Sequence, residues 1–175
     1  MKKLIYIIML LIFSYFSKFQ VEEKKSSKKN IEHSKKSEIP KEVRGKVLYI
    51  PDGDTIHITM NGEKFKIRFY GIDCPEISQP YGLEAKEFLM RHIDKNDVKV
   101  EVVEKDRYGR LVGKVYSRGV YLNELMVEEG YAWWYKNYAK KEKKMEILQI
   151  RAEKEKKGLW SQENPQAPWE YRKKK

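Results

Sequence analysis

The strongest constraint on the fold is the Asn61-Gly62 dipeptide, which separates two runs that alternate apolar with polar residues. Thr55 to Met60 precede it and Lys64 to Tyr70 follow it. Asn-Gly is the preferred pair for a two-residue hairpin turn, because both central residues of that turn need positive φ. These residues predict two antiparallel strands, with the start of the first facing the end of the second.

The remaining hydrophobic patterns complete an α+β arrangement. Further alternating runs predict strands at residues 43–50, 98–103 and 111–116. Amphipathic or charged segments predict helices at residues 83–93, 123–129 and 138–157. Gly130 and Gly158 follow the last two of these segments, as glycine commonly follows a helix. Five strands, the first three consecutive, with about three helices inserted and appended, predict a small closed β-barrel.

Composition narrows the kinds of partner and metal. The chain has 37 Lys+Arg against 26 Asp+Glu, a net charge of +11, which favours contact with nucleic acid, an anionic membrane or an acidic partner. One cysteine excludes an internal disulfide. One cysteine and three scattered histidines also exclude the usual tetrahedral zinc site. Any metal must therefore be held by oxygen ligands.

The first 42 residues differ from the rest. Residues 1–21 combine a basic start with an apolar run, which predicts a signal peptide or an N-terminal membrane anchor. The run is shorter than the roughly 20 residues of a spanning helix and lacks an A-x-A cleavage pattern, so both alternatives stay open. Residues 22–42 are rich in Lys, Glu and Ser and predict a disordered linker. We expect a secreted or otherwise extracytoplasmic protein, with a globular domain at 43–160 and a basic tail at 161–175.

Acidic residues gather at the ends of two predicted strands. Asp52-Gly53-Asp54-Thr55 opens the second strand, and Asp73-Cys74-Pro75-Glu76 follows the third. The hairpin register brings these loops together, and hard divalent cations prefer such oxygen ligands. Taken singly, each motif also fits a turn or a helix start. An EF-hand starting at Asp52 is excluded because Ile56 occupies a ligand position.

Two arginines are placed to meet phosphate. Arg68 alternates out of phase with the apolar residues of its strand, so it can face a cleft. Arg110 ends the segment Asp106-Arg107-Tyr108-Gly109-Arg110, in which the glycine suggests a tight turn. The planar guanidinium donates two hydrogen bonds at once and stays charged. The alternative for each is an ordinary surface ion pair.

Together these motifs resemble the thermonuclease, or staphylococcal nuclease, family over Val43 to Trp160. The ordered segments that carry the resemblance are 52–55, 68–76, 81–85, 106–110, Asn123 and 130–133. The resemblance implies an OB-type five-stranded barrel with helices. It also implies a calcium-dependent, sugar-non-specific endonuclease that hydrolyses DNA and RNA to products ending in 3′-phosphate.

The resemblance also assigns roles by position. Asp54 and Asp73 would be the metal carboxylates, joined by the backbone carbonyl of Cys74. Arg68 and Arg110 would bind phosphate, and Glu76 would be the general base. Cys74 stands where the family often has Thr, so its thiol could alter the metal preference or be oxidised. The loop from Glu76 to Tyr81 is short, which puts in doubt substrate contacts made there by longer-looped relatives.

The chemistry of a phosphodiester supports these roles independently. Its negative charge repels a nucleophile, so a catalyst needs a cation, a base beside the attacking water and donors that follow the developing charge. Tyr108 and Tyr135 offer faces on which unpaired bases could stack, as do Trp133 and Trp134, which predicts a preference for single strands. The alternative for the aromatic residues, Trp133 and Trp160 especially, is a place in the core.

Other functions compete with an exported monomeric nuclease. One alternative is a nucleic-acid-binding OB-fold scaffold without catalysis, although the proposed acids and arginines are all present. A third interpretation is a membrane-tethered protein whose tail, Arg172 to Lys175, binds anionic lipid or DNA. It leaves the acidic loops unexplained. The sequence leaves open whether DNA or RNA is the natural substrate.

Overall fold

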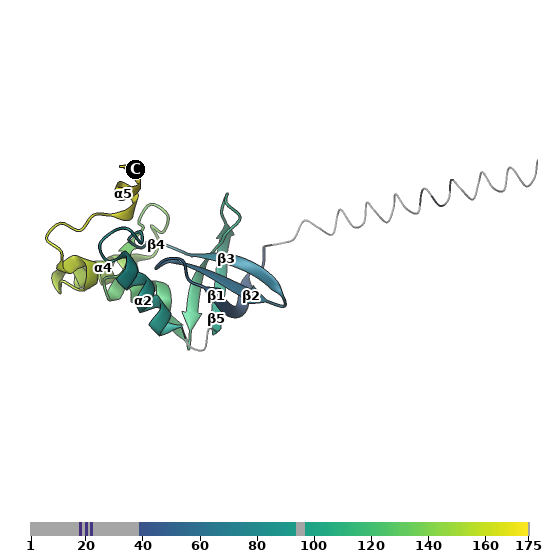
Figure 1. Ribbon diagram of the computed structural model, residues 1–175, viewed down its shortest axis with the longest axis horizontal. Helices are drawn as coiled ribbons and strands as arrows, with labels where there is room; N and C mark the ends of the chain where they lie inside the picture. The colour runs from purple at the N-terminus through teal and green to yellow at the C-terminus, as the bar shows by residue number, and fades with distance from the viewer. Residues whose placement is uncertain (1–17, 19, 21, 23–38, 94–96, 175) are drawn as a thin grey trace, which may run out of the picture. The chain divides into compact units, whose positions relative to one another are not determined.

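The computed structural model describes residues 18, 20, 22, 39–93 and 97–174 (Figure 1). The fold described below belongs to a compact unit at Ile39–Lys175. Apart from residues 18, 20, 22 and 39–42, the predicted leader at 1–21 and linker at 22–42 lie outside the described residues. Within the described part of the chain, no helix is both long enough and apolar enough to cross a bilayer.

Strands dominate the first part of the unit and helices the last part. In chain order the elements are β1 (Glu42–Tyr49), β2 (Thr55–Met60), β3 (Glu63–Phe69), β4 (Ile72–Asp73), α2 (Gly82–His92), β5 (Asp97–Lys105), β6 (Leu111–Ser117), β7 (Val120–Tyr121), α3 (Leu122–Glu128), β8 (Trp133–Trp134), α4 (Lys143–Lys154), the 3₁₀ helix η2 (Gly158–Ser161) and α5 (Pro168–Lys173).

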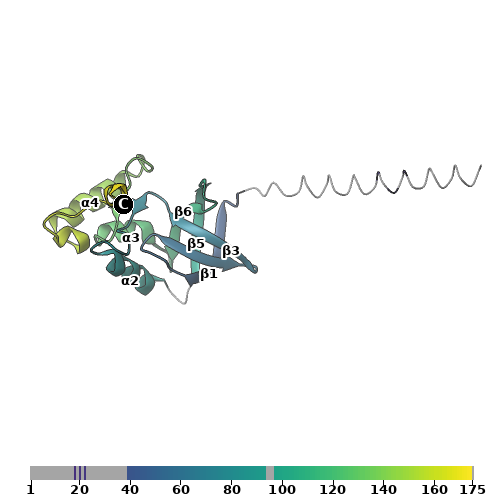
Figure 2. The same ribbon diagram turned by 45° about the horizontal axis from the view of Figure 1, so that its top comes forward.

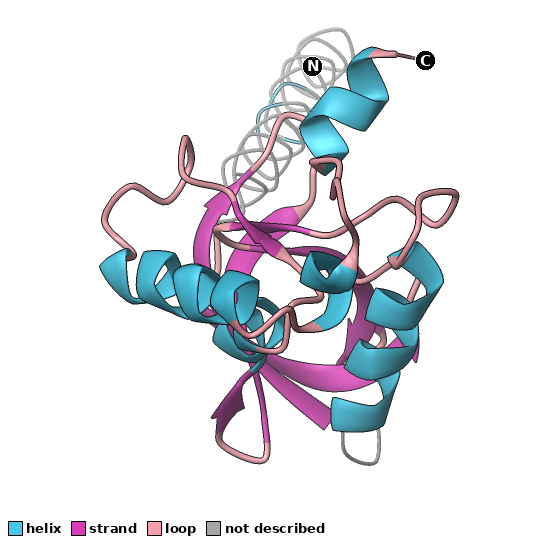
Figure 3. Ribbon diagram, turned by 90° about the vertical axis from the view of Figure 1, so that its left-hand side faces the viewer, coloured by secondary structure: helices cyan, strands magenta, loops and turns pink. Residues whose placement is uncertain are grey.

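Five strands close into a barrel, as the sequence predicts. Neighbouring strands follow the order β3-β2-β1-β5-β6, and a parallel pairing of β3 with β6, which matches Ile67 with Leu111, joins the two ends. The short strand β7 pairs antiparallel with β6 at the end of this sheet. β4 pairs with β8 as a separate two-stranded sheet. Helices α2, α3 and α4 gather at one side of the strands (Figures 2 and 3). The fold is an OB-type barrel with added helices.

The Asn61-Gly62 hairpin forms as predicted. Both residues have positive φ, 52° and 82°, and their turn connects β2 to β3. The register pairs Met60 with Glu63 beside the turn and Thr55 with Arg68 at the far end. This register sets the loop before β2 against the end of β3, where the sequence predicts the candidate site.

Alternate residues of the strands fill the barrel. Ile56 and Ile58 of β2 are fully buried, as is Ile67 of β3, and Leu89 of α2 and Met126 of α3 close the core from the helical side. Burying such side chains contributes about 1.5–3 kcal/mol each. Arg68 lies between the inward-facing Ile67 and Phe69, so the strand's own alternation directs it away from the core.

Buried Asn123 ties α3 to the place where β3 and β6 meet. Its Oδ1 accepts a hydrogen bond from the Val115 N–H at 3.0 Å, and its Nδ2 donates to the carbonyl oxygens of Tyr70 at 2.8 Å and Gly113 at 3.2 Å. A side chain with no exposed surface needs such partners. Asn123 therefore fixes the barrel closure.

The C-terminal segment differs from the predicted basic tail. A further helix, α5, begins at Pro168, and both Ala167 and Pro168 are buried. Trp169 explains the order of this segment, because it stacks on Tyr135 and packs edge-on against Trp133. Aromatic burial offsets the entropy of ordering a short helix whose charges alone would leave it solvated.

Candidate active site

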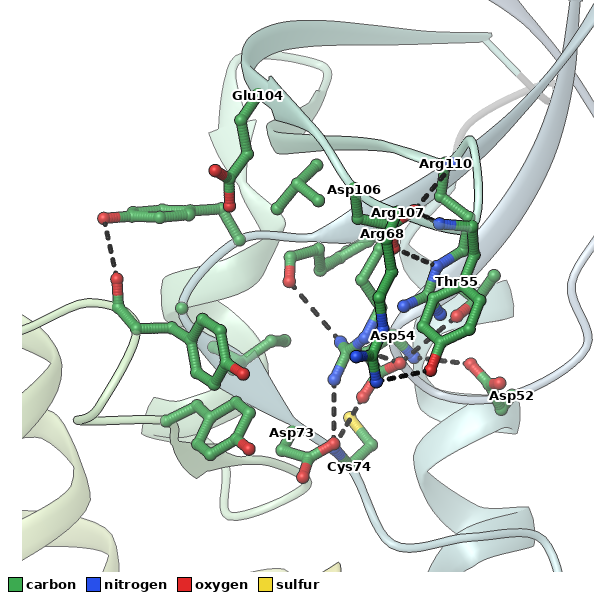
Figure 4. A pocket seen from close by; sticks show the side chains of 18 of the residues that line it. Asp52, Asp54, Thr55, Arg68, Asp73, Cys74, Glu104, Asp106, Arg107 and Arg110 are labelled. Carbon is green, nitrogen blue, oxygen red and sulfur yellow. Dashed lines mark hydrogen bonds and ion pairs between the residues drawn. The ribbon is translucent and has the colours of Figure 1, made fainter. Parts of the chain in front are cut away.

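One pocket of about 760 Å³ collects the predicted metal-binding, catalytic and phosphate-binding residues together with the two predicted stacking tyrosines (Figure 4). It lies where the loop before β2, the end of β3, the loop after β4 and the turn between β5 and β6 converge. The predicted residues in its lining are Asp54, Arg68, Asp73, Cys74, Glu76, Tyr108, Arg110 and Tyr135. Their roles remain predictions, but their convergence is a property of the fold.

Arg68 bridges two buried carboxylates at the pocket floor. Its Nη1 lies 2.8 Å from Asp54 Oδ1, and its Nη2 lies 2.8 Å from Asp73 Oδ1. Both aspartate side chains are almost inaccessible to solvent, and Arg68 itself is only 14% exposed. In Figure 4 the two acids point toward this one guanidinium. The result is a desolvated, fixed charge network.

The surroundings of Asp54 disfavour its ionised form, even though Arg68 lies beside it. Burial raises the pKa of Asp54 to about 7, the nearby charges of Asp52 and Asp73 add to the shift, and Arg68 and the Cys74 N–H oppose it. Burial alone would lower the pKa of Arg68, but the two aspartates outweigh it and raise that pKa. A further cation near Asp54 would stabilise its ionised form.

The donor set fits a hard cation that takes few protein ligands. Asp54 and Asp73 supply carboxylate oxygens in one place, while no cluster of three or more His, Cys, Asp or Glu side chains suited to a metal occurs among the described residues. Two carboxylates with main-chain oxygen, water and substrate phosphate are an ordinary set for calcium or magnesium. The raised pKa of Asp54 is consistent with a carboxylate that such an ion would stabilise.

Cys74 contributes its main chain to the pocket and its side chain to the core. Its N–H donates to Asp54 Oδ2 at 2.6 Å, while the sulfur packs beside Gly53 and Ala85, so that a Cβ on Gly53 would lie 2.9 Å from Sγ. Burial, reinforced by the charge of Asp54, raises the thiol pKa well above its ordinary value. The raised pKa favours the protonated thiol here, and an effect of Cys74 on the metal preference stays a prediction.

The turn before β6 holds Arg110 as the sequence predicts. Asp106 Oδ1 accepts the backbone N–H groups of Tyr108 and Arg110, both at 2.9 Å, and its Oδ2 accepts Arg110 Nε at 2.7 Å. Burial alone would raise the pKa of Asp106, but these bonds and the charge of Arg110 bring it below the usual value. One carboxylate therefore shapes the turn and orients the arginine (Figure 4).

Glu76 lies on a short loop that is braced from within. Its N–H donates to Gln79 Oε1 at 2.8 Å, and the Gln79 N–H donates to the Glu76 carbonyl at 2.7 Å. Gly82 opens α2 against this loop, where a Cβ would overlap the Glu76 carbonyl oxygen. The Glu76 side chain remains 39% exposed at the pocket, where a base could meet water.

Comparison with known proteins agrees with this geometry. The family model described as "Staphylococcal nuclease homologue" matches residues 66–162, more than half of the chain. The chain belongs to the staphylococcal nuclease family. The match includes Arg68, Asp73, Glu76 and Arg110, whereas Asp54 and α5 lie outside it.

Individual relatives of this family occur in bacteria and plants. The chain is 36% identical over 135 residues to an uncharacterized endonuclease of Escherichia coli, covering 77% of this chain and 88% of that protein. It is 37% identical over 139 residues to a micrococcal nuclease of Shigella flexneri, covering 74% and 80%. With the staphylococcal-like nuclease CAN1 of Arabidopsis thaliana it shares 43% identity over 115 residues, covering 65% of this chain and 35% of the plant protein. The chain thus spans about a third of the plant relatives' length.

The aromatic residues of this nuclease-family pocket fall into two groups. Tyr108 is 69% exposed at the tip of the turn, near the cations of Arg107 and Arg110. Tyr135 lines the pocket but is stacked on Trp169 at a ring separation of 5.2 Å. Trp134 and Trp160 are buried, as the core alternative predicts for Trp160.

Sequence reasoning missed Arg172, which enters the pocket from α5. Its guanidinium donates to Asp73 Oδ2 at 2.7 Å and to Glu76 Oε1 at 2.8 Å. The available signal was Trp169 and Tyr171, two aromatic residues that a solvated basic tail would not need. A helix start at Pro168 was a second signal.

Proposed function

We propose that this chain is an endonuclease that hydrolyses the phosphodiester bonds of DNA and RNA with calcium and leaves 3′-phosphate ends. The observation that carries the proposal is the convergence of two buried carboxylates, two oriented arginines and Glu76 on one pocket. Membership of the staphylococcal nuclease family supports it, as does the net charge of +11, which attracts polyanions.

The two arginines would bind the phosphate and follow its developing charge. Arg68 is held by Asp54 and Asp73, and Arg110 by Asp106, so neither side chain must be ordered when substrate arrives. Donors that are already in place stabilise a transition state more than donors that must reorganise. Their hydrogen bonds strengthen as charge builds on the phosphoryl oxygens.

Glu76 would act as the general base. It takes one proton from water while the water oxygen bonds to phosphorus, and the bond from phosphorus to the 5′ oxygen breaks. The departing oxygen receives a proton from solvent water, so the products are a 3′-phosphate and a 5′-hydroxyl. Partial exposure at the pocket lets the carboxylate of Glu76 meet water.

Asp54 and Asp73, with the backbone carbonyl of Cys74, would hold the calcium ion. When bound, such an ion supplies positive charge to the phosphoryl oxygens. The carboxylates of this chain contribute by keeping that charge at the pocket floor, beside Arg68.

We further propose a preference for single strands. Tyr108 is exposed beside the pocket, and an unpaired base can stack on such a ring whatever its identity. Tyr135, which lines the pocket and is stacked on Trp169, would offer the second aromatic surface.

Cleavage of end-labelled single-stranded DNA and RNA in calcium, magnesium or excess chelator tests the function. We expect cleavage in calcium, none in chelator, and 3′-phosphate on the products. Glu76→Gln keeps the size of the side chain but removes the base, so cleavage should fall by roughly 10²-fold or more while binding changes little. A parent protein that binds single strands but never cleaves them would establish the scaffold alternative.

Export is a separate proposal. It rests on the basic start and apolar run of residues 1–21, which would deliver a monomeric domain outside the cytoplasm, either cleaved or tethered. Cell fractionation with antibody against the folded domain tests it. Full-length protein found only in the cytosol would refute export without affecting the nuclease proposal.

A further inference from the structure

Arg172 joins two acids that have different proposed roles. Its Nη2 lies 2.7 Å from Asp73 Oδ2 and its Nη1 lies 2.8 Å from Glu76 Oε1, with a longer contact of 3.4 Å from Nη1 to Asp73 Oδ1. Asp73 therefore accepts hydrogen bonds from Arg68 on one side and Arg172 on the other. The pKa of Arg172 is raised, chiefly through its bond to Asp73.

The helix that carries Arg172 is docked on the Glu76 loop by other contacts. The hydroxyls of Tyr171 and Ser78 lie 3.0 Å apart, and Gln79 Nε2 donates to the Gln166 carbonyl at 3.2 Å. Trp169 adds its stack on Tyr135. Gln79 also braces the Glu76 N–H. Figure 1 shows α5 near β4, the element that contains Asp73.

These contacts distinguish the Arg172–Asp73 ion pair from an ordinary surface salt bridge. An exposed ion pair contributes about 0–1 kcal/mol because two flexible side chains must be ordered in water. Here one partner, Asp73, is only 2% exposed, and α5 is already held against the loop that bears Glu76. Arg172 therefore reaches the half-exposed Glu76 carboxylate from a position that its bond to buried Asp73 helps to hold.

We propose that Arg172 is a positioning residue of this active site, which holds the Glu76 carboxylate and its loop toward Asp73. The proposal rests on the proposed nuclease function for its effect on catalysis. Its structural part stands independently, since α5 would order the loop whatever reaction the pocket performs. The segment lies beyond residues 66–162, the range of the family match.

Steady-state cleavage of single-stranded DNA tests the effect on catalysis. Arg172→Gln should lower kcat by about 10-fold and change KM less than about 2-fold, because a displaced base slows the chemical step more than it weakens binding. Arg172→Lys should recover part of the loss, since lysine reaches one carboxylate as a point charge. Lys173→Gln removes the same charge from an exposed position on the same helix and should leave kcat unchanged.

Combination with Glu76→Gln separates positioning from a general structural effect. If Arg172 acts through Glu76, the double variant Glu76→Gln/Arg172→Gln should cleave within about 2-fold of Glu76→Gln alone. A further 10-fold loss in the double variant would overturn the proposal. So would an Arg172→Gln protein that is as fast as the parent. A faster protein that needs less calcium would also overturn it, by showing that Arg172 blocks the site.

Hydrogen exchange of the metal-free protein provides a readout that needs no activity. The Glu76 and Gln79 amides should exchange about 10-fold faster in Arg172→Gln, with the β2 and β3 amides unchanged, and Lys173→Gln should match the parent. Unchanged exchange at these two amides would overturn the positioning role. Faster exchange in Arg172→Gln, combined with a parent protein that never cleaves, would retain the positioning role and refute the nuclease proposal.

Discussion

The two arginines that the sequence predicts for phosphate are held in contrasting ways. Arg68 projects from a barrel strand and bridges two buried aspartates, while Arg110 projects from a turn and pairs with Asp106. Their side chains are 14% and 32% exposed. Arg68 thus contributes to the stability of the fold besides its proposed role in catalysis, whereas Arg110 would fill its proposed role with little effect on the fold. Identical residue types in one pocket need not be equivalent.

The largest difference should appear when each arginine is replaced by glutamine. Both variants should lose roughly 10²-fold or more in cleavage rate, because each removes a donor to the transition state. Only Arg68→Gln should also lower the free energy of unfolding, by about 3 kcal/mol, since it removes the arginine that pairs with buried Asp54 and leaves Asp73 with Arg172. Arg110→Gln should lower it by less than about 1 kcal/mol.

Urea denaturation in chelator measures these unfolding free energies. Arg68→Lys keeps the charge and should recover part of the stability but little of the rate, because lysine lacks the paired donors. Equal stability losses in Arg68→Gln and Arg110→Gln would show that burial does not distinguish the two sites.

Calcium should sharpen the same contrast. An ion that binds the folded protein alone stabilises it by about 2.7 kcal/mol at a hundredfold excess over Kd. Arg110→Gln should retain this stabilisation, since the carboxylate paired with Arg110 is Asp106, whereas Asp54→Asn and Asp73→Asn should lose it. Thermal denaturation across a calcium titration measures the effect. Stabilisation that survives in both asparagine variants would place the ion elsewhere.

The smallest expected effect concerns Tyr108 on the exposed turn. Tyr108→Ala should weaken binding of single strands by about 1 kcal/mol, near the lower value for loss of one stacked base, and leave stability unchanged. Fluorescence anisotropy with an oligonucleotide in chelator measures the affinity. Tyr49→Ala, at an exposed tyrosine outside the pocket lining, is the matched control. Equal losses in the two variants would remove Tyr108 from the binding surface.

Much of this organisation can be predicted because it is local. Alternation places Arg68 opposite Ile67 and Phe69, and Asn61-Gly62 fixes the register that joins the two acidic loops. The turn around Asp106 depends on residues within four positions of one another. Such features follow from backbone geometry and short spacing, and the structure confirms them.

The parts that escaped prediction depend on distant contacts. Arg172 reaches Asp73 because the segment around it is docked by two long-range contacts. Trp169 stacks on Tyr135, and Gln79 donates a hydrogen bond to the Gln166 carbonyl. No periodicity in the sequence links these positions. The direction of the Cys74 sulfur likewise depends on the space left by Gly53 and Ala85. A pattern along the chain predicts which face a side chain takes, but not which remote segment covers that face.

The parallel pairing of β3 with β6 has a consequence for the order of folding. Arg68 belongs to the β2–β3 hairpin and Asp54 directly precedes it, whereas Arg110 lies in the turn of the β5–β6 hairpin. Each hairpin can form from residues that are close in the sequence. The β3–β6 pairing joins residues that are far apart in the sequence, and such pairings form late in folding. The two arginines therefore meet only at closure. Recovery of cleavage during refolding should lag behind formation of the hairpins, so catalysis would report the final step of assembly.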